Sequence, residues 1–178
     1  MKYLIVSDVH GSYYYTKKLK EIIEVEKPNK VILLGDLYYH GPRNELPKEY
    51  SPKDVCNYFN SIKDKLIAIK GNCDAEVDEM ISDFKIKKSF KFKYNNKLFF
   101  LSHGHKYNED NFPNTPFDVM IYGHYHTGFI KTKNSKVIAN AGSLSLPKND
   151  TENSYLTIEN GCMFLKNLKC NIIDSVKI

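Results

Sequence analysis

Hydrophobic and polar positions follow a different pattern in each half of the chain. The first half alternates short, continuously apolar runs with segments of helical spacing. A continuously apolar run indicates a strand buried on both faces of a sheet. We therefore expect a βαβαβ order, with strands over 2–7, 30–34 and 66–70 and helices over 13–26 and 52–63.

The ends of the two predicted helices carry local signals. In the segment 13–26, Leu19, Ile22 and Ile23 share one helical face, and Pro28 follows the segment. Ser51 before Pro52 offers a capping residue and a proline at the first helical position. A third, short helix is expected after Asp74.

The second half is predicted to be mostly β. Residues 90–94 alternate with period two, Asn95-Asn96 offers a tight turn, and 97–101 returns as a strand. Further strands are expected over 119–122, 129–132, 137–140 and 155–159, the last entering a hairpin through Asn160-Gly161. The pattern predicts one α/β domain over residues 1–178 with two packed sheets.

Composition narrows the class of protein. The chain has 178 residues, 42% hydrophobic, and its longest apolar runs are far shorter than the ~20 residues of a membrane span. Its start does not read as a signal peptide, because polar Ser7-Asp8 closes the first apolar run early. The four cysteines show no CxxC spacing and no disulfide framework, as expected for reduced thiols in a cytosolic protein. We expect a cytoplasmic protein without a membrane association. The net charge of +5 fits nucleic acid, a phosphorylated substrate or simply a solvated surface.

Polar residues follow five of the predicted strands, each in a turn that carries glycine. In α/β sheets the carboxyl ends of strands form the crevice where ligands bind. A single histidine or aspartate there is usually structural, but a stability-driven core has no reason to gather so many, since each costs about 1–3 kcal/mol if unsatisfied. The strand ends should bring together Asp8, His10, Asp36, Asn72, His103, His124 and His126.

The chemistry of this set points to two divalent cations. Seven N and O donors exceed one tetrahedral site but suit two five- or six-coordinate ions, with Asp36 placed to bridge them. Imidazole, carboxylate and amide without thiolate suit Mn²⁺, Fe²⁺, Co²⁺, Ni²⁺ or Zn²⁺. Such a pair would lower the pKa of a bridging water and clamp a phosphoryl oxygen during in-line attack.

The ordered motifs resemble those of the calcineurin-like metallophosphoesterases. The segments Gly35 to Asn44 and Asn140 to Lys148 resemble the YfcE-type branch of bacterial phosphodiesterases. The resemblance implies a four-layer αββα sandwich of two mixed β-sheets flanked by helices. It also implies hydrolysis of small or nucleotide-like phosphodiesters with two divalent ions, Mn²⁺ being the first choice. The motifs that carry it are Asp8-Val9-His10, Gly35-Asp36, Gly71-Asn72-Cys73-Asp74, His103-Gly104-His105 and Gly123-His124-Tyr125-His126.

Carried over by matching motif, the ligands divide into two sets that share Asp36. The resemblance gives the first ion Asp8, His10, Asp36 and His126. It gives the second ion Asp36, Asn72, His103 and His124. The residues expected to serve catalysis are Asp36, Asn72, Cys73 and His103.

Cys73 departs from many relatives, where a histidine at this position is thought to protonate the leaving group. A thiol with a pKa near ~8.5 replaces imidazole poorly as a general acid. Activity should therefore depend on the leaving group, unless Cys73 is only a small packed residue. Cysteine here is also characteristic of the YfcE-type branch.

Other residues near the motifs have open roles. His40 and Arg43 follow Asp36 and are candidates for contact with substrate, Arg43 through phosphate oxygens; a turn and a surface or subunit contact explain them equally well. His105 is expected to hydrogen-bond near the site without ligating. Tyr125 replaces a usually small residue, and it either lines the pocket or points into the fold.

Two other functions compete with the phosphodiesterase. One is a non-catalytic interaction scaffold on the same fold, resembling the retromer subunit that lost ligand residues; the intact ligand positions oppose it. The other is a nuclease, suggested by the basic pI. Nucleases of the superfamily carry capping domains for which this chain has no length, so a nucleic-acid partner is not expected. The relatives often self-associate, which makes a homo-oligomer an expectation by analogy.

Overall fold

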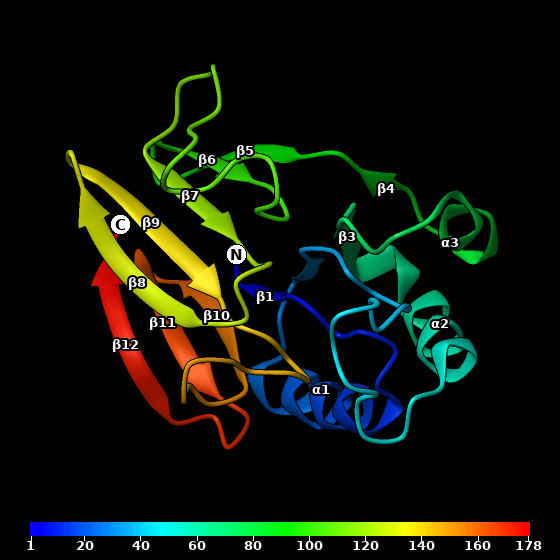
Figure 1. Cartoon of the computed structure of the whole chain (residues 1–178). Helices are drawn as coiled ribbons and strands as arrows, with labels where there is room; N and C mark the ends of the chain where they lie inside the picture. The colour runs from blue at the N-terminus through cyan, green and yellow to red at the C-terminus, as the bar shows by residue number, and fades with distance from the viewer.

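The computed structural model describes all 178 residues and consists mainly of two β-sheets packed face to face (Figure 1). The first sheet has seven strands, of which β1 to β4 run parallel and β10 to β12 are antiparallel. Its order is β12 (Ile172–Lys177), β11 (Cys162–Asn167), β10 (Ser154–Glu159), β1 (Tyr3–Val6), β2 (Lys30–Leu33), β3 (Leu66–Ile69) and β4 (Ile86–Lys87).

The second sheet has five strands and is also mixed. Strands β6, β7 and β9 are parallel, while β5 and β8 join the two edges antiparallel. The β5–β6 hairpin turns at Asn95-Asn96, both with positive φ, as a tight turn of this kind requires. The order is β5 (Phe90–Tyr94), β6 (Lys97–Leu101), β7 (Val119–Tyr122), β9 (Lys136–Ala141) and β8 (Gly128–Lys133).

Three α-helices form close to the predicted positions. They are α1 (Tyr13–Glu26), α2 (Pro52–Ser61) and α3 (Glu76–Ile81), with a 3₁₀ turn η1 (Lys63–Lys65) after α2. The Ser12 hydroxyl caps α1 by accepting from the backbone N–H of Tyr15. Ser51 precedes α2 as expected, but its hydroxyl donates to the Asp54 carboxylate rather than capping the backbone.

Period-two alternation divides the strand residues between two cores. Leu4 and Val6 of β1 face α1 and α2, whereas Tyr3 and Ile5 face the other sheet. This second set meets Phe99 and its neighbours from β6 and β7 between the sheets. Strands in the middle of the first sheet are therefore apolar throughout, which is the pattern that the sequence shows.

The two outer faces are covered differently. Helices α1 and α2 pack on the seven-stranded sheet (Figure 1). On the five-stranded sheet, Phe117 of the irregular segment 102–118 covers Phe100, Met120 and Ile138. The predicted α/β class with two mixed sheets is confirmed, and its outermost layer over the second sheet is this segment. No helix is both long and apolar enough to cross a bilayer.

The parallel pairings decide where the loops lie. Strand β1 pairs parallel with β2, and β2 with β3, so the turns that follow them gather at one edge of the first sheet. The turns after β6 and β7 leave the parallel part of the second sheet in the same way. The five predicted polar turns therefore converge where the two sheets meet.

Candidate metal centre

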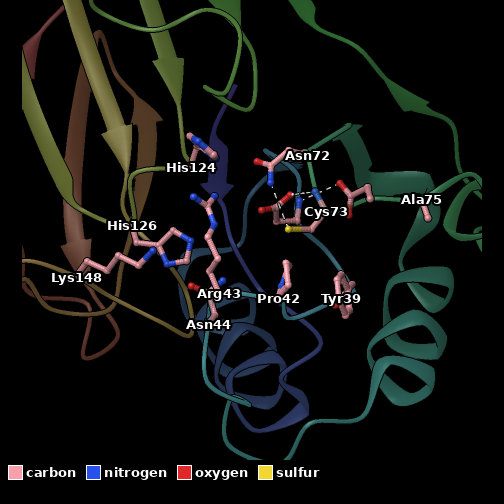
Figure 2. A pocket seen from close by; sticks show the side chains of 13 residues that line it. Tyr39, Pro42, Arg43, Asn44, Asn72, Cys73, Ala75, His124, His126 and Lys148 are labelled. Atoms are coloured by element: carbon pink, nitrogen blue, oxygen red, sulfur yellow. Dashed lines mark hydrogen bonds between the residues drawn. The ribbon is translucent and has the colours of Figure 1, made fainter.

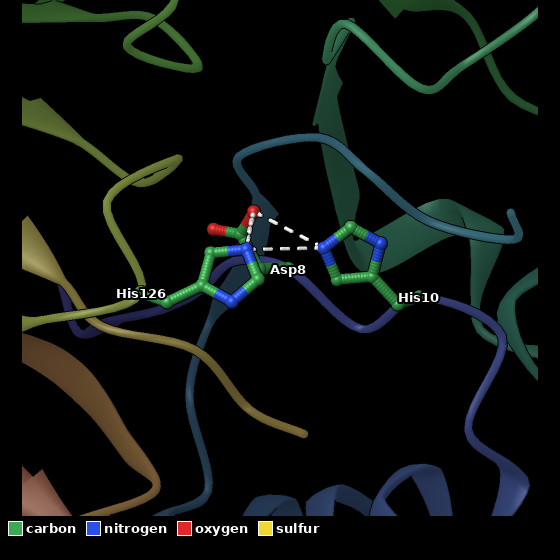
Figure 3. A group of neighbouring side chains, drawn as sticks. All are labelled: Asp8, His10 and His126. Carbon is green, nitrogen blue, oxygen red and sulfur yellow. Dashed lines mark hydrogen bonds and ion pairs between the residues drawn. The ribbon is translucent and has the colours of Figure 1, made fainter. Parts of the chain in front are cut away.

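The first group of converging side chains consists of Asp8, His10 and His126 (Figure 3). The Nε2 atoms of the two histidines lie 3.2 Å apart. Asp8 Oδ1 lies 3.2 Å from His126 Nε2 and 3.6 Å from His10 Nε2. All three side chains are buried, so one buried pocket holds three donor atoms within reach of a single ion.

The second group consists of His103, Asn72 and His124, which come from three different loops. His103 Nε2 lies 3.0 Å from Asn72 Oδ1 and 3.2 Å from His124 Nδ1. Unlike the other histidines here, His124 directs its Nδ1 toward its neighbours.

Asp36 lies between the two groups and contacts both through one oxygen. Its Oδ2 is 3.8 Å from His10 Nε2 and 3.4 Å from His103 Nε2. Its Oδ1 is turned away and accepts the backbone N–H of Cys73 at 2.8 Å. The structure thus brings together all seven residues that the strand ends predicted, with Asp36 in the middle.

The orientation of three histidine rings, two in the first group and one in the second, favours cation binding at this cluster. The Nδ1 atoms of His10, His103 and His126 lie 2.6–2.8 Å from backbone carbonyl oxygens of Tyr39, Leu34 and Leu146. A ring that donates through Nδ1 carries its lone pair on Nε2 when neutral. Asp8 Oδ1 is buried without a hydrogen-bond partner and faces two of these nitrogens. A divalent ion with N and O ligands fits these converging acceptor atoms.

The carboxylates perturb the titration of their neighbours. Burial alone would lower the pKa of His103, but the adjacent Asp36 and Asp8 raise it to about 9. Burial would raise the pKa of Asp8, but His10 and His126 hold it well below its usual range. Burial and the nearby His103 lower the pKa of His124 to about 4. The two buried carboxylates thus favour positive charge on the histidines beside them, and a bound cation would supply that charge instead.

Backbone strain accompanies the cluster. Five of the seven residues have positive φ, between 51° and 64°, a region that residues other than glycine rarely adopt. The five are Asp8, His10, Asp36, His124 and His126. Two glycines permit the close approach of the loops: a Cβ on Gly71 would lie 2.0 Å from Asp36 Oδ1, and one on Gly123 would lie 1.8 Å from Ser7 Oγ.

Asp74 is a positioning residue whose role the sequence did not reveal. Its buried carboxylate accepts backbone N–H groups from Asp36, Leu37 and Gly71 at 2.7–2.9 Å. Burial raises its pKa to about 6, so the carboxylate is ionised at neutral pH and can accept all three bonds. Asp74 thereby ties the loop that carries Asp36 to the loop that carries Asn72.

The end of β9 and the segment that follows it support the first group from outside. Ser143 and Ser145 both donate to the backbone carbonyl of Asp8, at 2.8 and 2.9 Å. Asn140 donates to the carbonyl of Gly123 at 2.7 Å. The sequence of this segment resembles that of its relatives, but only the fold shows that it braces the loops that carry Asp8 and His124.

A cavity of about 500 Å³ opens beside the cluster (Figure 2). Arg43 points into it toward His124 and His126, and Cys73 lies on its opposite wall. Arg43 is exposed and makes no ion pair. Burial and the carboxylate of Asp36 raise the pKa of Cys73 to about 12, so its thiol stays neutral.

Three other predicted residues are placed less centrally. His40 does not line this cavity; its ring lies against Tyr39 and Tyr50, and its Nδ1 is 2.6 Å from the Gly41 carbonyl. His105 is exposed, with its ring 5.5 Å from that of His103 and without the hydrogen bond that was expected. Tyr125 packs edge-on against the buried Tyr122 and so points into the fold.

Two mixed sheets, with a histidine and aspartate cluster at the loops where they meet, define a metallophosphoesterase. The family model of the calcineurin-like phosphoesterase superfamily domain matches residues 1–161. The chain therefore belongs to this superfamily, and the prediction that it is an enzyme of this kind is confirmed.

Individual relatives narrow the relationship. Phosphodiesterase YfcE of Escherichia coli K12 is 36% identical over 162 residues, covering 90% of this chain and 88% of that protein. The solved structure of that phosphoesterase from E. coli superposes with a TM-score of 0.96 at 34% identity, over 100% of both chains. Zn²⁺-complexed Vps29 from Entamoeba histolytica shares the fold, with a TM-score of 0.61 at 15% identity over 99% of each chain.

Proposed function

We propose that this protein is a dinuclear metal-dependent phosphodiesterase that hydrolyses small or nucleotide-like phosphodiesters. The observation that carries the proposal is the position of Asp36 Oδ2, 3.8 Å from His10 Nε2 and 3.4 Å from His103 Nε2. One carboxylate oxygen between two donor groups is the arrangement that a shared pair of ions requires. The name of the relative that is 36% identical, a phosphodiesterase, supports the choice of substrate class.

In this proposal each donor group holds one ion. Mn²⁺ is the first choice, and Ni²⁺, Zn²⁺, Fe²⁺ and Co²⁺ are compatible with imidazole, carboxylate and amide donors. When bound, the pair would supply an acidified water as nucleophile and would neutralise charge on the phosphoryl oxygens. The first ion takes Asp8, His10, Asp36 and His126; the second takes Asp36, Asn72, His103 and His124.

The chain's own residues bind and orient the substrate. The Arg43 guanidinium is free of ion pairs and points across the cavity toward the cluster, where it can pair with phosphate oxygens (Figure 2). Lys148 lies on the same side of this cavity and adds positive charge. The neutral Cys73 thiol lies on the other side and is a weak proton donor for a leaving alcohol.

Chelation followed by metal return tests the proposal. Protein dialysed against EDTA should lose hydrolysis of bis(p-nitrophenyl) phosphate, and Mn²⁺ should restore it more fully than Mg²⁺. Elemental analysis of the reloaded protein should give two ions per chain. p-Nitrophenyl phosphate, a monoester, should be a poorer substrate. Reloaded protein that hydrolyses neither ester would favour the interaction scaffold instead, and preferential cleavage of DNA would favour the nuclease.

A further inference from the structure

A second cavity, whose lining does not include Arg43, adjoins the metal centre. Its volume is about 620 Å³, and three chain segments form its walls: 70–74 after β3, 88–89 between β4 and β5, and 102–107 after β6. Residues 88–89 lie where the chain crosses from the first sheet to the second. The cavity therefore opens at the junction of the two sheets, as the metal centre does.

The two cavities share part of the metal centre as a common wall. Asn72 lines both, His103 lines only the second, and His124 lines only the first. These three residues form the second donor group. A phosphodiester carries two ester groups on one phosphorus, so a phosphoryl group held at the centre can direct one ester group into each cavity. Both volumes lie within the range of small-ligand pockets.

The second cavity carries positive charge that the protein does not neutralise. Lys88 and Lys106 line it, are exposed, and make no ion pair, whereas the third lysine, Lys70, is bound to Glu79 at 2.6 Å. The acidic residue of the lining is Asp74, whose carboxylate is already occupied by three backbone N–H groups. An anionic group entering this cavity comes beside two lysines that have no ion-pair partner, and beside no free carboxylate.

We infer that the second cavity binds an ester group of the substrate that itself carries a phosphate, and that Lys88 and Lys106 select for it. The inference rests on the proposed function. It predicts that the preferred substrates are phosphodiesters in which one of the two ester groups carries a second phosphate. Because the two lysines are exposed, their attraction falls as salt screens it. We expect a preference of roughly tenfold at low ionic strength, the sum of two modest surface interactions.

Two p-nitrophenyl esters of thymidine 5′-phosphate, one with and one without a 3′-phosphate, test the inference in the Mn²⁺-loaded protein. The 3′-phosphorylated ester should have a roughly tenfold lower KM, and salt should weaken the advantage. The K88A/K106A double variant should lose the advantage and hydrolyse the plain ester at an unchanged rate. The matched control is K20A/K53A, which removes two exposed, unpaired lysines from α1 and α2 and should keep the advantage.

A binding measurement separates this inference from the proposed function. Thymidine 3′,5′-bisphosphate should bind the loaded protein more tightly than thymidine 5′-phosphate in calorimetry, and K88A/K106A should abolish the difference. If the protein binds with this difference but hydrolyses neither ester, the proposed function fails and the inferred anion site stands. Equal KM values for both esters in wild-type protein would overturn the inference, as would loss of the advantage in K148A rather than K88A/K106A.

Discussion

Asp8 Oδ2 accepts the backbone N–H of His124 at 2.9 Å, across 116 residues of sequence. This bond joins the loop after β1 to the loop after β7 and leaves the other oxygen, Oδ1, facing His126 and His10. Asp8 thus uses one oxygen to join two loops and leaves the other for the cation of the proposed metal centre.

Asn at position 8 should separate these two roles. Its carbonyl oxygen can keep the bond to His124, but its amide nitrogen offers no lone pair to an ion. We expect the free energy of unfolding of D8N in EDTA to lie within about 1 kcal/mol of the wild-type value. Its activity should fall by a factor on the order of 100 or more. Saturating Mn²⁺ should stabilise wild type by about 2–3 kcal/mol and D8N by much less. Thermal unfolding with and without Mn²⁺ measures both. An equal Mn²⁺ response in D8N would remove Asp8 from the ligand set.

The carboxylate of Asp74 should matter for catalysis through Asp36. An Asn at position 74 has one acceptor oxygen for three buried N–H groups, so at least one is left unpaired. We expect D74N to lose about 1–3 kcal/mol of stability and about 10–100-fold in kcat, with little change in KM.

The matched control for D74N is D78N. Asp78 is also buried and accepts the N–H of Ala75 at 2.8 Å, but it holds no part of the metal centre. D78N removes a negative charge from the first turn of α3, so it should lose up to about 1 kcal/mol of stability without a lower kcat. If D74N keeps wild-type kcat once it is folded, Asp74 is only a structural residue.

Cys73 should make the rate depend on the leaving group. With its pKa raised to about 12, the thiol protonates a departing alkoxide poorly, so alkyl esters should lag behind p-nitrophenyl esters by about 100-fold or more. A series of aryl methyl phosphodiesters with phenols of rising pKa should give a steep Brønsted slope. C73H, which supplies imidazole, should flatten the slope, while C73A should leave it unchanged. A shallow slope in wild-type protein would refute this role.

The central residues of the site could be predicted because a single geometric rule places them. Parallel strands end at one edge, so Asp8, Asp36 and Asn72 had to meet there, and the apolar runs identified those strands. The rule does not give side-chain direction. His40 follows the same strand end as Asp36, yet its ring packs against Tyr50, because a loop has no fixed period that would tell which way a side chain points.

What the sequence could not reveal depends on contacts between distant loops. The hydrogen bonds of Asp74 span 38 residues to reach Asp36, and no local pattern encodes them. In the sequence, nothing distinguishes Lys88 and Lys106 from the rest of the 26 lysines and arginines. Only the fold places both of them at one cavity. Strand β4 has two residues, too few for any periodicity, and it forms because β3 offers it an edge.

Glu26, at the end of α1, should set the acid stability of the fold. Its carboxylate accepts hydrogen bonds from Lys2, Lys166 and Tyr155 at 2.6–2.9 Å. Burial would raise the pKa of Glu26, but these bonds lower it to about 2. An unfolded glutamate has a pKa near ~4.3, so the unfolded chain binds a proton first as the pH falls. The stability that Glu26 contributes is therefore complete above about pH 4.3 and is lost toward pH 2.

Replacement by Gln should remove this pH-dependent part. We expect E26Q to lose about 2 kcal/mol at pH 7, and the difference from wild type should shrink between about pH 4 and pH 2. Urea unfolding of both proteins in EDTA at several pH values measures the difference, in which the titration of all other groups cancels. The control is E21Q on the same helix, whose exposed pair with Lys18 should be worth at most about 0.5 kcal/mol. A difference between E26Q and wild type that stays constant from neutral pH to pH 3 would show that Glu26 acts by packing and not by charge.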